Sequence, residues 1–322
     1  MSETSRCASA LNFIAAAFHG VQAIVVCSLI AWLDSQPRSG MLFNGGRFEL
    51  VRVVPVWRET TIESVVMDSG QIDVLYVIFA FFVLSAVFQC AGGMLPPHIA
   101  SQVRFVEYSF SASIMMMAIA LEAGIRDLYT LQCMFVLIWA TQVFGLLADT
   151  ISGYAVRQCT EYSDFGLNQR TLRTADLWGW VVPHATGWVT CMSAYAPAID
   201  VFIQSSARSE RNPPSFVTGL VFAELVMFSC FGLVQTYGLV TKSMLCCNRE
   251  AVIDIALDDA EDDYSSYSGS RHRRTTKKRL PEKIRDVDAT CEYAFIILSL
   301  TAKTMLCWIV IAPLITDRMN KK

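Results

Sequence analysis

The sequence has little charge. Aspartate, glutamate, lysine and arginine together make up 17% of its 322 residues, against about 25% in an ordinary soluble domain. Hydrophobic residues make up 53%, and the mean hydropathy is +0.40. This composition is typical of a polytopic membrane protein, so the lipid bilayer is the first expected partner. The net charge of −3 gives no reason to expect a nucleic-acid partner.

Several familiar signals are absent. The opening MSETSRCASALNF has no basic segment and no small-residue cleavage site, so we do not expect a cleaved signal peptide. The eleven cysteines lie mostly inside apolar runs and none falls in 35–71, which argues against a disulfide framework. The histidine and cysteine spacings fit no metal site, and we find no phosphate loop or nucleophile elbow. We therefore expect neither a metal nor an enzyme.

Seven apolar stretches are long enough to cross about 30 Å of hydrocarbon as helices. They lie near 8–33, 72–94, 100–122, 128–154, 177–204, 215–243 and 289–315. The predicted fold class is an all-α membrane protein. Its architecture is a seven-transmembrane-helix bundle that forms a single domain over residues 1–322.

Two of the connections between these stretches are long. Residues 34–71 alternate β-branched and charged residues after Asn44-Gly45-Gly46, a pattern typical of a β-hairpin, and Pro55 favours an edge strand or a bulge. Residues 246–288 hold an acidic block, a Ser/Tyr/Gly spacer and a basic block, which cannot bury a core. We expect an extracellular hairpin at 34–71 and a charged, mostly disordered cytoplasmic loop at 246–288.

The distribution of lysine and arginine predicts the orientation in the membrane. Seven spans place the two termini on opposite sides. With a cytoplasmic N-terminus, fifteen of these residues are cytoplasmic and ten are extracellular. Most of the cytoplasmic excess comes from 246–288, and without it the count would favour the reverse. The full count favours a cytoplasmic N-terminus and an extracellular C-terminus.

One lysine, Lys303, lies in the middle of the seventh apolar stretch, EYAFIILSLTAKTMLCWIVIAPLI. An ammonium group at that depth costs at least ~2.5–3.5 kcal/mol, so it must be paired, hydrated or chemically converted. Its central position makes snorkelling to an interface awkward. Ser299, Ile296 and Glu292 share its helical face. We expect that face to point into the bundle.

The third apolar stretch contains a carboxylate. Glu107 lies within RFVEYSFSASIMMMAIALEAG, with Ser111 and Met115 on the same helical face. A buried carboxylate needs a partner, and Lys303 is the obvious one. From the residues alone, the pair is either a plain interhelical ion pair or part of a chemical site.

Histidines and tryptophans supply weaker candidates. His19 lies in the first stretch and His184 in the fifth, and a lone buried histidine is more often a hydrogen-bonded core residue than a functional one. Trp178 and Trp180 fit an aromatic belt at the membrane interface. Trp188 fits the wall of a ligand pocket instead.

Four segments resemble the heliorhodopsin family. RFVEYSFSAS and EYAFIILSLTAKTMLCW resemble its third- and seventh-helix motifs, and LNFIAAAFHGVQ and FGLLAD resemble its first- and fourth-helix motifs. A lysine amine in a dry bundle suits a Schiff base with an aldehyde. The resemblance implies that this aldehyde is all-trans retinal. It also implies an inverted topology and a hairpin-bearing first outer loop, and we expect a homodimer.

The resemblance assigns roles residue by residue. Lys303 matches the retinal lysine, Glu107 its counterion, and Ser299 the serine one turn from the lysine. Glu292 matches an acidic position near the inner end of the seventh helix. His19 matches an inner-side histidine in a polar cavity.

The sequence departs from the family at three places. Gln89 stands where the second helix usually carries a histidine, and Asp149 stands where glutamate is common. The 246–288 segment is longer than the family needs, which suggests an added surface for a cytoplasmic signalling partner.

These inferences predict a light-sensing photoreceptor. Glu107 keeps a retinal Schiff base on Lys303 protonated, because a nearby opposite charge stabilises the cation. The expected signalling involves no active ion pumping. The residues expected around the cofactor are Lys303, Glu107, Ser299, Ser111, Met115, Ile296 and Trp188, and those expected in a proton or polar network are His19, Glu292, Gln89 and Glu224.

Two alternatives remain open. One is a light-gated passive proton channel, to which Glu224 in the sixth stretch could contribute. The other is a non-photochemical receptor or transporter in which Lys303 merely pairs with Glu107.

Overall fold

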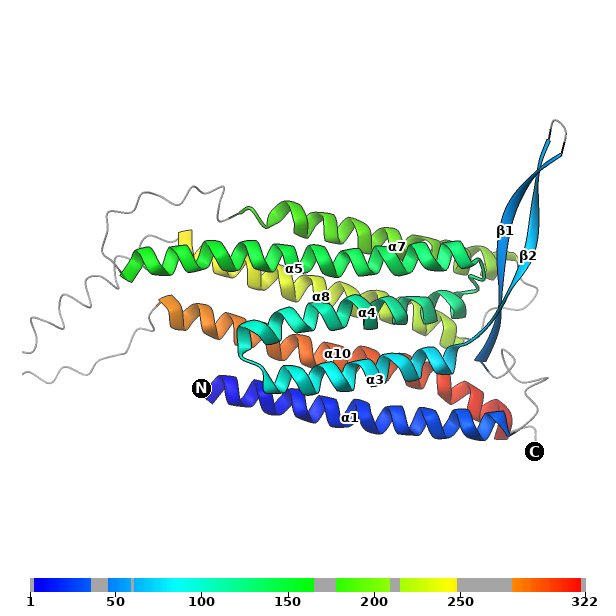
Figure 1. Ribbon diagram of the computed structural model, residues 1–322, viewed down its shortest axis with the longest axis horizontal. Coiled ribbons are helices and arrows are strands. Elements are labelled where there is room, and N and C mark those ends of the chain that lie inside the picture. The colour runs from blue at the N-terminus through cyan, green and yellow to red at the C-terminus, as the bar shows by residue number, and fades with distance from the viewer. Residues whose placement is uncertain are drawn as a thin grey trace, which may run out of the picture.

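The computed structural model describes residues 3–35, 46–58, 61–164, 178–208, 215–247 and 280–319. Within these ranges, seven helices form a bundle and two strands form a hairpin at one end of it (Figure 1). The helices are α1 (Glu3–Asp34), α3 (Val74–Met94), α4 (Pro97–Ala123), α5 (Leu128–Asp164), α7 (Val181–Arg208), α8 (Ser215–Cys247) and α10 (Leu280–Met319), and the strands are β1 (Arg47–Arg58) and β2 (Thr61–Asp73). The predicted all-α seven-helix fold with its hairpin is confirmed.

Six of these helices are long and apolar enough to cross a membrane: α1, α3, α4, α5, α8 and α10. The remaining helix, α7, carries polar residues along its whole length, among them His184, Asp200 and Gln204. It packs along α5 and also contacts α4 and α8, so it completes the bundle as its fifth helix. The chain is thus a multi-pass membrane protein.

The helices alternate in direction, and consecutive helices pack together from α1 to α7 (Figure 1). α10 closes the bundle by packing between α8 and α1. The most enclosed helix is α4, because 72% of its apolar window is buried, against 28% in α5 and in α8. Most positions on α4 therefore contact other helices, and the buried Glu107 is one of them.

The hairpin stands at the end of the bundle where α1 ends and α3 begins, here called the hairpin end (Figure 1). The strands pair antiparallel, and the register shifts between Glu49 and Val51. The irregularity is therefore not at Pro55, which pairs regularly with Ser64 on an edge strand. The Val51 amide donates to the Arg126 carbonyl at 3.0 Å, which fixes the hairpin base to the α4–α5 turn.

The opposite end of the bundle, where α1 and α10 begin, is here called the N-terminal end (Figure 1). The prediction of one loop over 246–288 is wrong at both limits, because α8 continues to Cys247 and α10 already begins at Leu280. The charged segment from 280 to 288 is helical because Leu280 and Ile284, one turn apart, pack against Val156 of α5. Residues 248–279 and Asn44-Gly45 lie outside the described residues.

Candidate functional site

Lys303 and Glu107 meet in the middle of the bundle. Lys303 Nζ on α10 donates to Glu107 Oε1 on α4 at 2.5 Å, and both side chains are 3% exposed. The ammonium group also donates to Ser85 Oγ on α3 at 2.5 Å, and it lies 5.3 Å from the centre of the Tyr108 ring. Three helices thus converge on one amine, and its charge is matched by a single buried carboxylate.

Ser85 was not singled out from the sequence. It lies in LSAVFQC of the second apolar stretch, one helical turn before Gln89, and both side chains are buried. The only sequence signal that could have identified Ser85 is its four-residue spacing from Gln89. It puts two polar residues on one face of a helix that otherwise consists almost entirely of aliphatic and aromatic residues.

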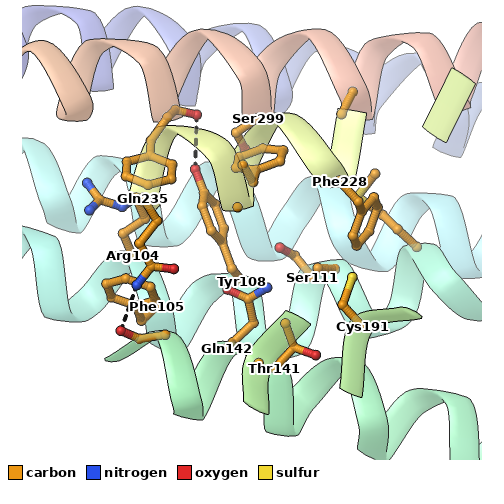
Figure 2. A pocket seen from close by; sticks show the side chains of 18 of the residues that line it. Arg104, Phe105, Tyr108, Ser111, Thr141, Gln142, Cys191, Phe228, Gln235 and Ser299 are labelled. Carbon is orange, nitrogen blue, oxygen red and sulfur yellow. Dashed lines mark hydrogen bonds between the residues drawn. The ribbon is translucent and has the colours of Figure 1, made fainter. Parts of the chain in front are cut away.

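A cavity extends from Lys303 between α4, α5, α7, α8 and α10 (Figure 2). Its lining is mainly aromatic and apolar, and Figure 2 shows Tyr108, Phe228 and Cys191 around it. The predicted cofactor residues on its wall are Lys303, Ser299, Ser111, Met115 and Trp188. Sequence reasoning missed other wall residues, namely Gln142, His184, Phe228, Phe231, Gly232 and Gln235.

Ile296 does not belong to this wall. It lines a smaller cavity on the other side of Tyr108, together with Glu107, Gln89 and Glu292. Tyr108 lines both cavities, and its hydroxyl donates to the Phe295 carbonyl at 3.1 Å (Figure 2). The structure thus places Ile296 at the smaller cavity, and its contact with the cofactor stays a prediction.

The chemistry of the cavity fits retinal, a long apolar aldehyde. A primary amine lies on the wall among mainly aromatic and apolar side chains, and Ser111 Oγ is buried with no hydrogen-bond partner among the described residues. The open volume is about 70 Å³, whereas small-molecule pockets usually enclose ~300–1,000 Å³. A ligand that needs a pocket of ~300–1,000 Å³ can enter only if the aromatic side chains move apart.

A second ion pair lies between this site and the N-terminal end. Arg104 on α4 pairs with Glu292 on α10, and its guanidinium lies 4.3 Å from the centre of the Phe295 ring. Glu292 thus faces Arg104 rather than Lys303. From the sequence, Arg104 was counted only as a charge near a span end, so this pair was not anticipated.

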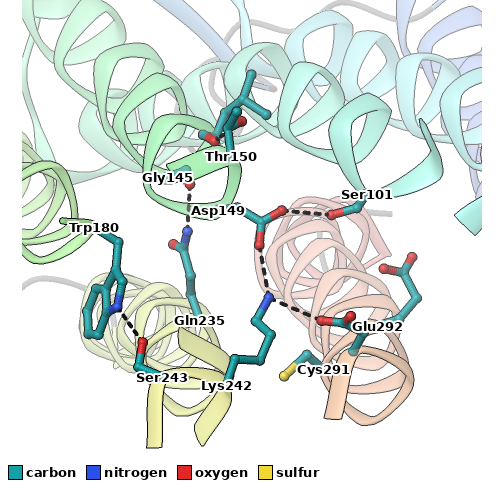
Figure 3. Close-up of polar contacts among 12 residues, drawn as sticks. Ser101, Gly145, Asp149, Thr150, Trp180, Gln235, Lys242, Ser243, Cys291 and Glu292 are labelled. Atoms are coloured by element: carbon teal, nitrogen blue, oxygen red, sulfur yellow. Dashed lines mark hydrogen bonds and ion pairs between the residues drawn. The ribbon is translucent and has the colours of Figure 1, made fainter. Parts of the chain in front are cut away.

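A network around Lys242 continues toward the N-terminal end (Figure 3). Lys242 Nζ on α8 lies 3.1 Å from Asp288 Oδ1 on α10 and 3.5 Å from Asp149 Oδ1 on α5, and Ser101 Oγ donates to Asp149 at 3.4 Å. These residues and the Arg104–Glu292 pair line a cavity of about 830 Å³. The polar groups are therefore concentrated between Lys303 and the N-terminal end.

The other predicted network residues lie at separate places. His19 is fully buried, and its Nδ1 lies 3.0 Å from Gln22 Oε1, while Gln22 Nε2 donates to Thr304 beside Lys303 at 2.9 Å. Gln89 lines the small cavity with Glu107. Glu224 is fully buried on α8 near Tyr195, and its carboxylate has no hydrogen-bond partner among the described residues.

The bundle has seven helices, and a buried lysine on the wall of an aromatic cavity pairs with a buried carboxylate. These features define a rhodopsin-type membrane protein. The sequence model of the family described as Heliorhodopsin matches residues 9–242. The match spans well over half of the chain, and the chain belongs to the heliorhodopsin family. It is a retinal-binding photoreceptor of a generally non-enzymatic membrane family. The comparison with curated proteins gave no match.

The matched stretch ends within α8 and does not include α10. The family match therefore covers Glu107 and Ser85 but not Lys303. What ties Lys303 to the same site is the contact between its amine and Glu107.

Proposed function

We propose that this protein is a light sensor in which Lys303 holds all-trans retinal as a protonated Schiff base, with Glu107 as counterion. The observation that carries the proposal is the 2.5 Å contact between these two side chains, of which Lys303 lines an aromatic cavity. When bound, retinal supplies the absorption of visible light and a light-driven change of shape. The protein supplies the amine, the charge that balances it and a wall that excludes water.

Each group beside the amine has a separate task. The Glu107 carboxylate stabilises a positive charge at the Lys303 nitrogen, because an opposite charge at hydrogen-bond distance favours the protonated form. Ser85 Oγ accepts a hydrogen from the same nitrogen at 2.5 Å. The Tyr108 ring lies beside the nitrogen and separates the main cavity from the smaller one around Gln89.

The proposed output is a change in helix position that a partner reads, without active ion transport. A cytoplasmic N-terminus would place the charged 246–288 segment in the cytoplasm, where a signalling partner could bind it. The lysine and arginine count and the family's inverted topology support this orientation. We also propose a homodimer, which light scattering of the detergent-purified protein would detect.

The decisive experiment is expression with retinal followed by a visible spectrum and a voltage-clamp recording. A pigment without steady photocurrent supports the sensor. The absence of a pigment would leave an ion-paired receptor or transporter as the remaining function.

A passive proton conductance is the second candidate. The observation in its favour is Glu224 on α8, a fully buried carboxyl group with no hydrogen-bond partner among the described residues. Ionisable residues inside membrane spans often mark proton or ion pathways. A photocurrent that reverses with the proton gradient would establish this function instead.

A further inference from the structure

His184 connects the wall of the main cavity to the neighbouring helix. It lies on α7 and lines the cavity together with Trp188, one turn further along the same helix. Trp188 Nε1 donates to His184 Nε2 at 3.2 Å. The same ring nitrogen lies 2.7 Å from Thr236 Oγ1 on α8. Two partners from two helices therefore compete for one nitrogen atom.

A count of hydrogens shows that these contacts cannot all be satisfied together. The indole N–H of Trp188 can only donate, so His184 Nε2 must carry no hydrogen when it accepts from Trp188. Thr236 must then donate its single hydroxyl hydrogen to that nitrogen. However, Thr236 Oγ1 also lies 2.8 Å from the Gly232 carbonyl oxygen, which can only accept.

The contacts therefore allow two arrangements. In the first, Nε2 accepts from both Trp188 and Thr236, and the Gly232 carbonyl receives no hydrogen from Thr236. In the second, Thr236 donates to Gly232, and Nε2 carries a hydrogen that it donates to Thr236. The Trp188 N–H then loses its acceptor. The two arrangements differ in whether the Trp188 ring is held by a hydrogen bond.

Packing restricts the Trp188 ring on its other side. A Cβ atom at Gly232 would overlap the carbons of the Trp188 ring, so the ring lies directly against the α8 backbone. Trp188 therefore touches α8 through Gly232, and it is linked to α8 a second time through His184 and Thr236. A ligand that pushes the ring would disturb both contacts.

We propose that His184 is a positioning residue for the chromophore: by accepting the indole N–H, it sets the orientation of the Trp188 ring in the cavity wall and couples that orientation to Thr236 on α8. This inference rests on the proposed retinal function. It assigns His184 a role different from that of a hydrogen-bonded core residue. α8 also carries Lys242, which pairs with Asp149 and Asp288 near the N-terminal end. The helix that contacts His184 therefore also belongs to that polar network.

The first test uses the retinal-free protein. The indole ¹H–¹⁵N signal of Trp188, assigned by its loss in Trp188→Phe, reports the hydrogen bond directly. His184→Phe removes the acceptor and should shift this signal, whereas His184→Gln supplies an amide oxygen and should restore it toward the wild-type position. A signal that is the same in wild type and His184→Phe overturns the inference.

The second test uses the absorption maximum of the retinal-loaded protein. His184→Phe should shift the maximum, and His184→Gln should recover part of the shift. In a Trp188→Phe background, His184→Phe should cause no further shift, because the donor that His184 acts through is gone. Additive shifts would show that His184 acts on the chromophore independently and would overturn the inference.

Ser243→Ala is the matched control. Trp180 Nε1 donates to Ser243 Oγ at 2.9 Å, so this substitution removes a hydrogen bond to α8 away from Trp188 (Figure 3). It should leave the absorption maximum unchanged, and an equal shift would mean that general loosening of α7 from α8 explains the effect. A wild type that forms no pigment overturns both the proposed function and this inference. A pigment that is insensitive to His184→Phe overturns the inference alone.

Discussion

Lys303 Nζ and Glu107 Oε1 lie 2.5 Å apart between α10 and α4, and 196 positions separate the two residues in the sequence. Each side chain is 3% exposed, so the pair has little contact with water or lipid. Breaking such a pair by removing one partner leaves an uncompensated buried charge. The two residues should therefore respond differently to substitution, since in the proposed function one binds the cofactor and the other balances its charge.

The first prediction is that Lys303→Ala abolishes the pigment. Alanine has no amine to bind retinal, so the purified variant should be colourless under conditions that give a coloured wild type. The measurement is the visible spectrum after retinal addition. Lys242→Met is the control, because Lys242 is also a buried lysine but pairs with Asp149 and Asp288. It should remain coloured, and a coloured Lys303→Ala would disprove the assignment.

The second prediction concerns the counterion. Glu107→Gln keeps the shape of the side chain but removes its charge. The visible band should shift strongly to the red or disappear at a lower pH than in wild type, because the cation on Lys303 loses its stabilising partner. The retinal-free variant should also unfold more easily, by on the order of 3–5 kcal/mol. Spectra titrated with pH and thermal unfolding provide the two measurements.

Glu292→Gln is the control for the counterion. Glu292 pairs with Arg104 rather than with Lys303, so its loss should change the spectrum much less. An unchanged spectrum and titration in Glu107→Gln would contradict the prediction and would transfer the role to Glu292 or Glu224.

The main features of this site could be predicted from the sequence because they break a simple pattern. Lys303 and Glu107 are charges deep inside apolar stretches, and such charges must face inward and find partners. The helices themselves were predictable because about 20 apolar residues are needed to cross a bilayer. Only the ends of the helices differed, most of all at 155–164, where α5 continues beyond its predicted end, and at 280–288, where packing of Leu280 and Ile284 outweighs a charged composition.

The remaining contacts could not be predicted because they depend on which helices are neighbours. Ser85 looks like any other serine in an apolar stretch until α3 and α10 are placed together. Asp149, Lys242 and Asp288 come from three helices and are far apart in the sequence. The link from Trp188 through His184 to Thr236 likewise depends on the register of α7 against α8.

The third prediction is that the N-terminus faces the cytoplasm. An epitope tag before Ser2 should bind antibody only after the cells are permeabilised, and a tag inserted between β1 and β2 should bind on intact cells. The start of α1 and the strands of the hairpin lie at opposite ends of the bundle (Figure 1). The hairpin tag is the internal control for surface expression. Binding to the N-terminal tag on intact cells would contradict both the proposed orientation and the inverted topology of the family.

The last prediction is that the protein does not pump ions. A pump needs a proton acceptor on one side of the retinal nitrogen and a donor on the other, so that each light cycle moves charge in one direction. The described polar network lies on one side of Lys303, where Arg104, Glu292 and Lys242 line a cavity of about 830 Å³. A proton released toward that cavity should therefore return from it.

On the other side, α10 reads TMLCWIVIAPLI from Thr304 to Ile315, with Cys307 as the one ionisable group of that stretch, and α4 is apolar from Ile114 to Leu121. Glu122 and Glu224 are the buried carboxyl groups of the described residues toward the hairpin end. Under voltage clamp, a sensor should show no steady photocurrent at any voltage. A passive pathway through Glu224 should give a current that reverses with the proton gradient and is lost in Glu224→Gln. A sustained photocurrent at zero voltage and zero proton gradient would show that the protein pumps ions, because only a pump moves charge without a driving gradient.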